Sequence, residues 1–75
     1  MKLLEVQTLK FYTTYNGKSE YQLLKELNLP DPEDAPTFEE CDAQQHRNVK
    51  AILDHYRSLG FTHLHDHETD ALTKL

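Results

Sequence analysis

Three histidines, His63, His65 and His67, alternate with other residues near the end of the sequence. In a β-strand, residues two apart lie on the same side at about 7 Å, so His63 and His65 can converge on one metal ion. Imidazole nitrogens suit Zn²⁺, Cu²⁺ and Ni²⁺, and a third ligand could come from His67, Asp66, Cys41 or a helix histidine. The three histidines are therefore a candidate zinc site.

A cluster of solvated histidines that binds no ion is the competing interpretation. The paired cysteine and histidine spacings of zinc modules are absent from the sequence. His63 and His67 also lie too far apart in an extended strand to share one ion easily. Metal binding is therefore an alternative function for this chain, and not the first one that the sequence favours.

A run of acidic residues without lysine or arginine lies between residues 26 and 42. It contains seven carboxylates, those of Glu26, Asp31, Glu33, Asp34, Glu39, Glu40 and Asp42. An acidic face can dock a basic protein, because complementary charge speeds and orients association. The commoner alternative is that some of these groups stabilise a helix N-terminus while the others solvate a loop.

Tyr12 is the aromatic residue that we most expect at the surface. If its strand alternates, half of the side chains face away from any covering helix, and exposed aromatic residues can anchor interfaces. Together with the acidic run, it gives the candidate partner-binding residues, which are Tyr12, Glu33, Asp34, Glu39 and Glu40.

The composition argues against several functions. A net charge of −5 repels the phosphate backbone, so we expect no direct nucleic-acid binding. Two glycines are too few for a phosphate-binding loop, and no Ser/His/Asp or Cys/His set can be assembled, so we expect no enzyme. The single cysteine, Cys41, excludes an internal disulfide and favours a reducing, cytoplasmic compartment. No apolar run is long enough for a signal peptide or a membrane span.

The elements that position these residues begin with a strand over residues 3–15. Alternating apolar, aromatic and β-branched residues indicate a half-buried strand. The apolar residues Leu4 and Val6 fall in the opposite phase to those that follow. We expect a β-bulge near Gln7 and Thr8 to reset the alternation, or else a strand that is buried on both faces.

The dipeptide Asn16-Gly17 is a turn signal with two possible continuations. Residues 18–23 could return as the second strand of a hairpin. Ser19 and Gln22 instead fit a helix capping box, and the leucine-rich residues after them favour a short helix that ends before Pro30. We prefer the helix, and the hairpin stays open.

A long amphipathic helix over residues 38–59 is the clearest element. It follows an acidic, proline-rich loop at residues 30–36, and Thr37 with Glu40 repeats the capping-box pattern. Gly60 suits a left-handed C-cap. The expected apolar stripe of the long helix consists of Phe38, Cys41, Val49, Ile52, Leu53, Tyr56 and Leu59.

The pattern of residues 61–65 predicts another strand. Residues 66–75 could form a helical turn, a third short strand or a frayed end. We therefore expect a single α+β domain over residues 1–75. Its small two- or three-stranded antiparallel sheet, made by residues 3–15 and 61–65, would carry the long helix and the short helix on one side. Such a sheet has free edges, so we expect a homodimer through the sheet edge or a tight complex.

The function expected first is that of a small accessory or regulatory protein that acts by protein–protein contact. It would inhibit or modulate a larger enzyme or complex. One alternative is the metal-binding module described above. Another is an acidic inhibitor that mimics nucleic acid and occupies the groove of a basic partner.

Overall fold

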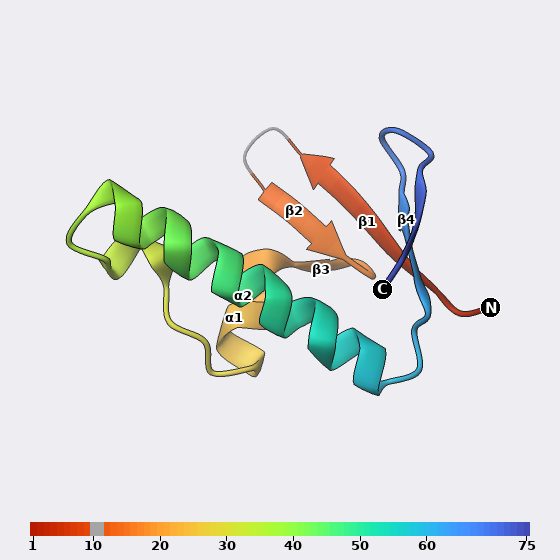
Figure 1. Cartoon of the computed structure of the whole chain (residues 1–75), viewed down its shortest axis with the longest axis horizontal. Helices are drawn as coiled ribbons and strands as arrows, with labels where there is room; N and C mark the ends of the chain where they lie inside the picture. Colours follow the sequence, from red (N-terminus) through yellow and green to blue (C-terminus); the bar gives the residue numbers. More distant parts are fainter. Residues whose placement is uncertain (10–11) are drawn as a thin grey trace.

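The protein has one five-stranded sheet, and a long helix crosses one side of it (Figure 1). The computed structural model describes residues 1–9 and 12–75. Its strands are β1 Leu3–Leu9, β2 Tyr12–Tyr15, β3 Lys18–Ser19, β4 His63–Asp66 and β5 Leu72–Lys74. Its helices are α1 Glu20–Glu26, the 3₁₀ helix η1 Pro32–Asp34 and α2 Phe38–Ser58. The strand order is β3-β2-β1-β4-β5, so β1 lies in the middle of the sheet.

The expected two- or three-stranded antiparallel sheet is wrong, because the sheet is mixed and has five strands. β1 pairs with β2 in antiparallel fashion and with β4 in parallel. The other two pairs, β2 with β3 and β4 with β5, are antiparallel. The parallel pair forms because α2 carries the chain back to the end of the sheet where β1 begins, and β4 then runs beside β1 in the same direction (Figure 1).

The single strand expected over the first part of the chain is two strands. Val6 of β1 lies opposite Tyr15 of β2, and both side chains are buried in the core. The change of phase therefore marks a reversal of the chain. The bulge expected near Gln7 and Thr8 is wrong, because these residues continue an unbroken ladder with β2. Residues 10 and 11, which the expected strand included, lie outside the described residues.

The Asn16-Gly17 turn is followed first by a short strand and then by a helix, the two continuations that the sequence allowed. Asn16 and Gly17 have φ angles of 53° and 82°, which suit the two central positions of a tight hairpin turn between β2 and β3. α1 begins directly after β3, and the Ser19 hydroxyl oxygen accepts a hydrogen bond of 3.1 Å from the backbone N–H of Gln22. The preferred short helix is confirmed, and a two-residue strand precedes it.

The long helix is confirmed, with 21 residues. At its start, the Thr37 hydroxyl oxygen accepts a hydrogen bond of 3.1 Å from the backbone N–H of Glu40. After its end, Gly60 has a φ of 97°, the left-handed conformation that favours glycine. The helix therefore begins and ends where its capping residues predict.

Only part of the expected apolar stripe of α2 enters the core. Ile52 and Tyr56 are buried, whereas Phe38 is 87% exposed and Leu59 is 52% exposed. The first turns of α2 extend past the strands, so the sheet cannot cover Phe38 (Figure 1). Cys41, Val49 and Leu53 are half-buried at the border.

The core joins the sheet to both helices. It consists of Leu4, Val6, Tyr15, Leu23, Leu24, Ile52, Tyr56 and Phe61. Within it, the Tyr56 hydroxyl donates a hydrogen bond of 3.3 Å to the backbone carbonyl of Tyr15. Burial, with a smaller effect of the Glu20 carboxylate, raises the pKa of Tyr15 to about 12.

Asn48 is the buried polar residue of α2, with 1% of its surface exposed. Its amide nitrogen donates a bond of 2.7 Å to the carbonyl of Pro30, and its amide oxygen accepts one of 2.8 Å from Gln44. The side chain thus fastens the loop after α1 to α2. Neither α1 nor α2 combines the length and apolarity that crossing a bilayer requires.

Candidate metal centre

Glu5 occupies the sheet face opposite the core. Its neighbours Leu4 and Val6 are both buried, and alternation along β1 turns the Glu5 carboxylate the other way. The Glu5 side chain is 39% exposed. A carboxylate in the central strand of the sheet is thereby held at the surface by the packing of the two apolar residues beside it.

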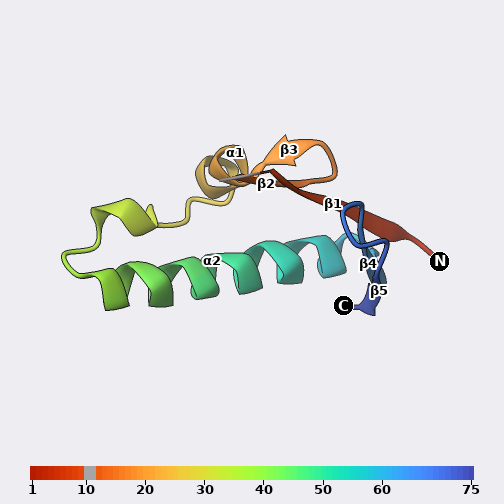
Figure 2. The same cartoon turned by 90° about the horizontal axis from the view of Figure 1, so that it is seen from above.

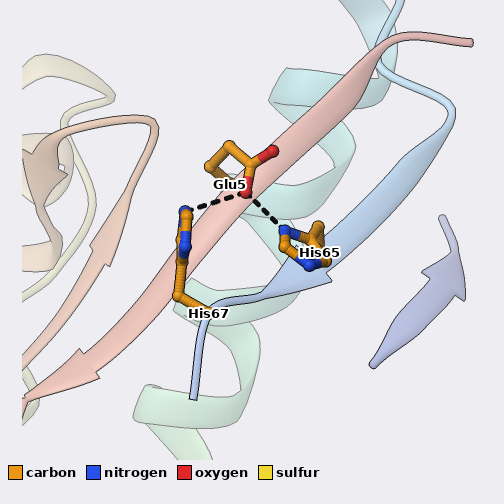
Figure 3. Close-up of side chains that lie close together, drawn as sticks. All are labelled: Glu5, His65 and His67. Atoms are coloured by element: carbon orange, nitrogen blue, oxygen red, sulfur yellow. Dashed lines mark hydrogen bonds and ion pairs between the residues drawn. The ribbon is translucent and has the colours of Figure 1, made fainter. Parts of the chain in front are cut away.

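The parallel pairing of β1 with β4 brings His65 beside Glu5. The two residues are register partners, and Nδ1 of His65 lies 2.7 Å from Oε2 of Glu5. His67 continues the ladder after β4, since its backbone N–H donates a bond of 2.9 Å to the carbonyl of Val6. Nε2 of His67 lies 2.9 Å from the same Glu5 oxygen. Figure 3 shows both imidazoles pointing at this oxygen.

Asp70 approaches His65 from the turn between β4 and β5. Its backbone is held at a φ of 56°, and its N–H donates a bond of 2.7 Å to the carbonyl of Asp66. This turn places Oδ1 of Asp70 2.6 Å from Nε2 of His65. His65 therefore has a carboxylate oxygen at each of its two ring nitrogens.

Two carboxylates favour the protonated form of the His65 imidazole. An imidazole that donates both N–H groups is protonated, and this form suits an acceptor on each side. The hydrogen bond to Asp70 raises the pKa of His65 above its ordinary value, and the bond to Glu5 adds to the rise. Partial burial lowers the pKa, but the two hydrogen bonds outweigh it.

The three side chains Glu5, His65 and His67, named here the Glu5–His65–His67 group, fit a transition-metal ion. Each offers one ligand atom, and these atoms lie within 4.8 Å of one another. Zn²⁺ bonds of about 2.0–2.2 Å in tetrahedral geometry separate ligand atoms by about 3.3–3.6 Å. The contacts of 2.7 and 2.9 Å at the Glu5 oxygen would therefore lengthen by about half an ångström or more to admit the ion.

Of the three predicted ligands, the structure brings together His65 and His67 and leaves His63 outside the group. Nδ1 of His63 lies 2.9 Å from the hydroxyl of Thr62, and its register partner on β5 is Lys74. A lysine neighbour repels a metal ion, whereas the Glu5 neighbour of His65 attracts one.

The third potential ligand atom belongs to Glu5, which the sequence reasoning missed. Asp66, one of the residues considered, instead accepts a bond of 2.8 Å from the backbone N–H of Glu68. Cys41 lies on α2, near the other end of the helix from β4. The phase of Glu5 between two apolar residues signals a surface carboxylate, but placing it beside His65 requires the parallel pairing.

The candidate partner-binding residues do not meet at one place. All five are exposed, and Tyr12 is 68% exposed. Tyr12 and Glu33 line a cavity of about 320 Å³ that α1, η1 and α2 surround. Asp34 and Glu40 line a smaller cavity of about 270 Å³ on the other side of η1.

The donor set of the Glu5–His65–His67 group is two imidazoles and one carboxylate. Such a set leaves a fourth tetrahedral position for water or an outside ligand. Asp70 would keep its hydrogen bond to Nε2 of His65 and so orient that ring from outside the ion's coordination shell. Comparisons of the chain with protein-family models, with curated proteins and with solved structures gave no significant match.

Proposed function

We propose that the protein binds one divalent transition-metal ion, Zn²⁺ first among them, at Glu5, His65 and His67. The observation that carries the proposal is the convergence of two imidazole nitrogens on one oxygen of Glu5, at 2.7 and 2.9 Å. These residues come from β1 and from the end of β4, 60 positions apart in the chain for Glu5 and His65. The ion would thus link two distant segments of the fold.

The donor types favour Zn²⁺ over Mg²⁺ or Ca²⁺. Magnesium and calcium prefer sites made of oxygen ligands, whereas imidazole is a common ligand of zinc, copper and nickel. Zn²⁺ also accepts four ligands without a strong geometric demand from its electrons. The Glu5–His65–His67 group would satisfy it once its ligand atoms, which lie within 4.8 Å of one another, adjust to the spacing of a zinc coordination shell.

The ion would act on stability. A chain of 75 residues buries a limited core, and small domains of this size often depend on a metal, a disulfide or a partner. The only cysteine cannot form an internal disulfide. An ion that ties β4 to β1 would hold the β4–β5 hairpin, whose place in the sheet depends on that single parallel pairing.

Other residues line the cavities of the described chain that lie along the helices. One of about 600 Å³ is lined by residues of α2 alone, and one of about 320 Å³ lies among β2, α1, η1 and α2. The proposed role is ion binding that supports the fold.

Zinc titration of the metal-free protein tests this proposal. Calorimetry should show one ion bound per chain. At a free Zn²⁺ concentration about 100 times the dissociation constant, linkage gives about 2.7 kcal/mol of stabilisation, or roughly 10–20 °C in Tm for a domain of this size. The variants Glu5→Gln and His65→Ala should lose most of the binding.

The matched control is His63→Ala, which removes the same side chain two positions away in the same strand. It should bind Zn²⁺ with the affinity of the unchanged protein. Absence of calorimetric heat together with an unchanged melting curve would end the proposal. Equal losses in His63→Ala and His65→Ala would place the ion at a different set of ligands.

A further inference from the structure

Figure 2 shows the sheet and α1 covering one side of α2, with the C-terminus beside its last turn. The flank of α2 next to its buried residues Ile52 and Tyr56 is covered by no other described element along its earlier turns. A groove of about 600 Å³ runs along this flank, and α2 alone lines it. We call it the outward groove, and the residues used below are Asp42, His46, Val49, Lys50, Leu53 and Arg57.

The spacing in the outward groove resembles the seam of a helix pair. Asp42, His46, Val49 and Leu53 follow one another at intervals of four, three and four residues, which is the alternation of contact positions in paired helices. Val49 and Leu53 form its apolar middle. Both are half-buried in the single chain, and Leu53 also packs against the core. A second helix laid on this side would remove them further from water.

The groove carries two acidic residues, Asp42 and Asp54, and two basic residues, Lys50 and Arg57. Asp42 lies near the start of α2, and Arg57 lies in its last turn. Arg57 is 58% exposed and contacts Asp54 at 3.2 Å. A guanidinium has five N–H donors, so this contact leaves Arg57 able to receive a second carboxylate.

We propose that two copies of this chain pair through their outward grooves, with the two α2 helices antiparallel and the two-fold axis between Val49 and Lys50. This register places Asp42 of each copy opposite Arg57 of the other. It places His46 opposite Leu53, and it lays the alkyl stem of Lys50 over Val49. The same surface serves both copies, as a two-fold interface requires.

Charge selects the second copy and the direction of pairing. A parallel pair would set Asp42 against Asp42 and Arg57 against Arg57, whereas the antiparallel pair sets each acid against a base. The whole chain has a charge of −5, which opposes contact between copies elsewhere. The outward groove does not add to that repulsion, because its two acidic and two basic residues balance, and the antiparallel register sets Asp42 against Arg57.

The pairing would be weak and independent of the proposed metal site. Each copy contributes one side of a 21-residue helix, about 30 Å long, so the contact belongs to the small class of interfaces below about 1,200 Å². None of the residues used here is a ligand in the Glu5–His65–His67 group. A failure of zinc binding would therefore leave this inference standing.

Sedimentation equilibrium of the full chain tests the pairing. Between about 10 µM and about 1 mM, the mass should rise from the 8.8 kDa of one chain towards twice that value. Asp42→Arg should raise the dissociation constant at least about tenfold, and so should Arg57→Asp, because each places like charges together. The double variant Asp42→Arg with Arg57→Asp should restore pairing to within about threefold.

Glu33→Arg is the control, since it makes the same change of charge on an exposed residue of η1 outside the groove. It should pair at least as well as the unchanged chain. Circular dichroism shows whether each variant keeps its helix content. If a charge reversal unfolds the protein, NMR of the unchanged chain still tests the pairing. Its backbone amide chemical shifts should change with protein concentration.

Those amide shift changes should fall along the outward groove of α2, from Asp42 to Arg57. A mass of 8.8 kDa throughout the concentration range would overturn the proposal. Shifts confined to β3 or β5 would overturn it as well, since they would show pairing through a sheet edge.

Discussion

Glu5 and His65 are register partners in the parallel β1–β4 pair, and Oε2 of the one lies 2.7 Å from Nδ1 of the other. The contact joins positions 60 residues apart. Without an ion it is a charge-assisted hydrogen bond, and in the proposed zinc-bound form both atoms would be ligands. Protons and metal therefore compete for one side chain, which makes both of the next two predictions dependent on pH.

The imidazole of His65 should titrate above its ordinary pKa in the metal-free protein. Its pKa is raised first by the hydrogen bond to Asp70 and then by the bond to Glu5. Because the folded protein holds the proton more tightly than the unfolded chain, this contribution to stability is fully present below the unfolded pKa. It is lost as the pH rises through the folded pKa.

Proton NMR of the histidine rings measures this titration directly. Asp70→Asn should lower the pKa of His65, since the amide removes a charged acceptor. Glu68→Gln, which changes a nearby exposed carboxylate outside the contacts of His65, should leave it in place. A His65 pKa at or below the ordinary value in the unchanged protein would contradict the arrangement of the two carboxylates.

Zinc affinity should fall as the pH falls. His65 must release the proton on Nδ1 before that nitrogen can bind an ion, and its raised pKa extends the range in which the proton competes. Calorimetry at about pH 6 and about pH 8 should therefore give the tighter dissociation constant at the higher pH. An affinity that does not change over this range would show that His65 is not a ligand.

Asn48→Ala should destabilise the protein by about 1–3 kcal/mol, because it removes a buried side chain and leaves the carbonyl of Pro30 and the amide of Gln44 without their partner at a partly buried site. Urea unfolding measures the loss. The control Gln45→Ala removes an exposed amide one position along the helix and should change the free energy of unfolding by less than about 0.5 kcal/mol. Similar losses in both variants would contradict the role given to Asn48.

Ile52→Ala and Phe38→Ala should differ sharply, although both residues belong to the same apolar stripe in the sequence. Ile52 is fully buried, so its truncation should cost about 2–5 kcal/mol. Phe38 is 87% exposed, so its truncation should cost less than about 0.5 kcal/mol in the single chain. Thermal melts at low protein concentration compare the two. A large loss in Phe38→Ala would mean that something covers this ring.

Local signals in the sequence predicted the helices well. Ser19, Thr37 and Gly60 each act within one turn of their own helix, so their effect can be read without knowing the rest of the fold. The hairpin at Asn16-Gly17 is local as well. For these elements, the sequence carries nearly all of the information.

The sheet and the third ligand depend on contacts between distant residues. Alternation could show that Glu5 faces away from Leu4, but not that β4 would lie beside β1 or run parallel to it. The position and the direction of β4 both depend on where α2 ends relative to the sheet. For the same reason His65 and His67 were predicted as ligands, while Glu5 was missed and His63 was included.

Because β1 lies in the middle of the sheet, its two neighbours pair with it at different times during synthesis. β2 follows β1 closely and can pair with it early, but β4 arrives only after the chain of both helices has been made. One edge of β1 must therefore stay unsatisfied through most of synthesis, and it is closed by the segment that carries His65 and His67. An ion bound there would stabilise the pairing of β4 with β1, which forms late in folding.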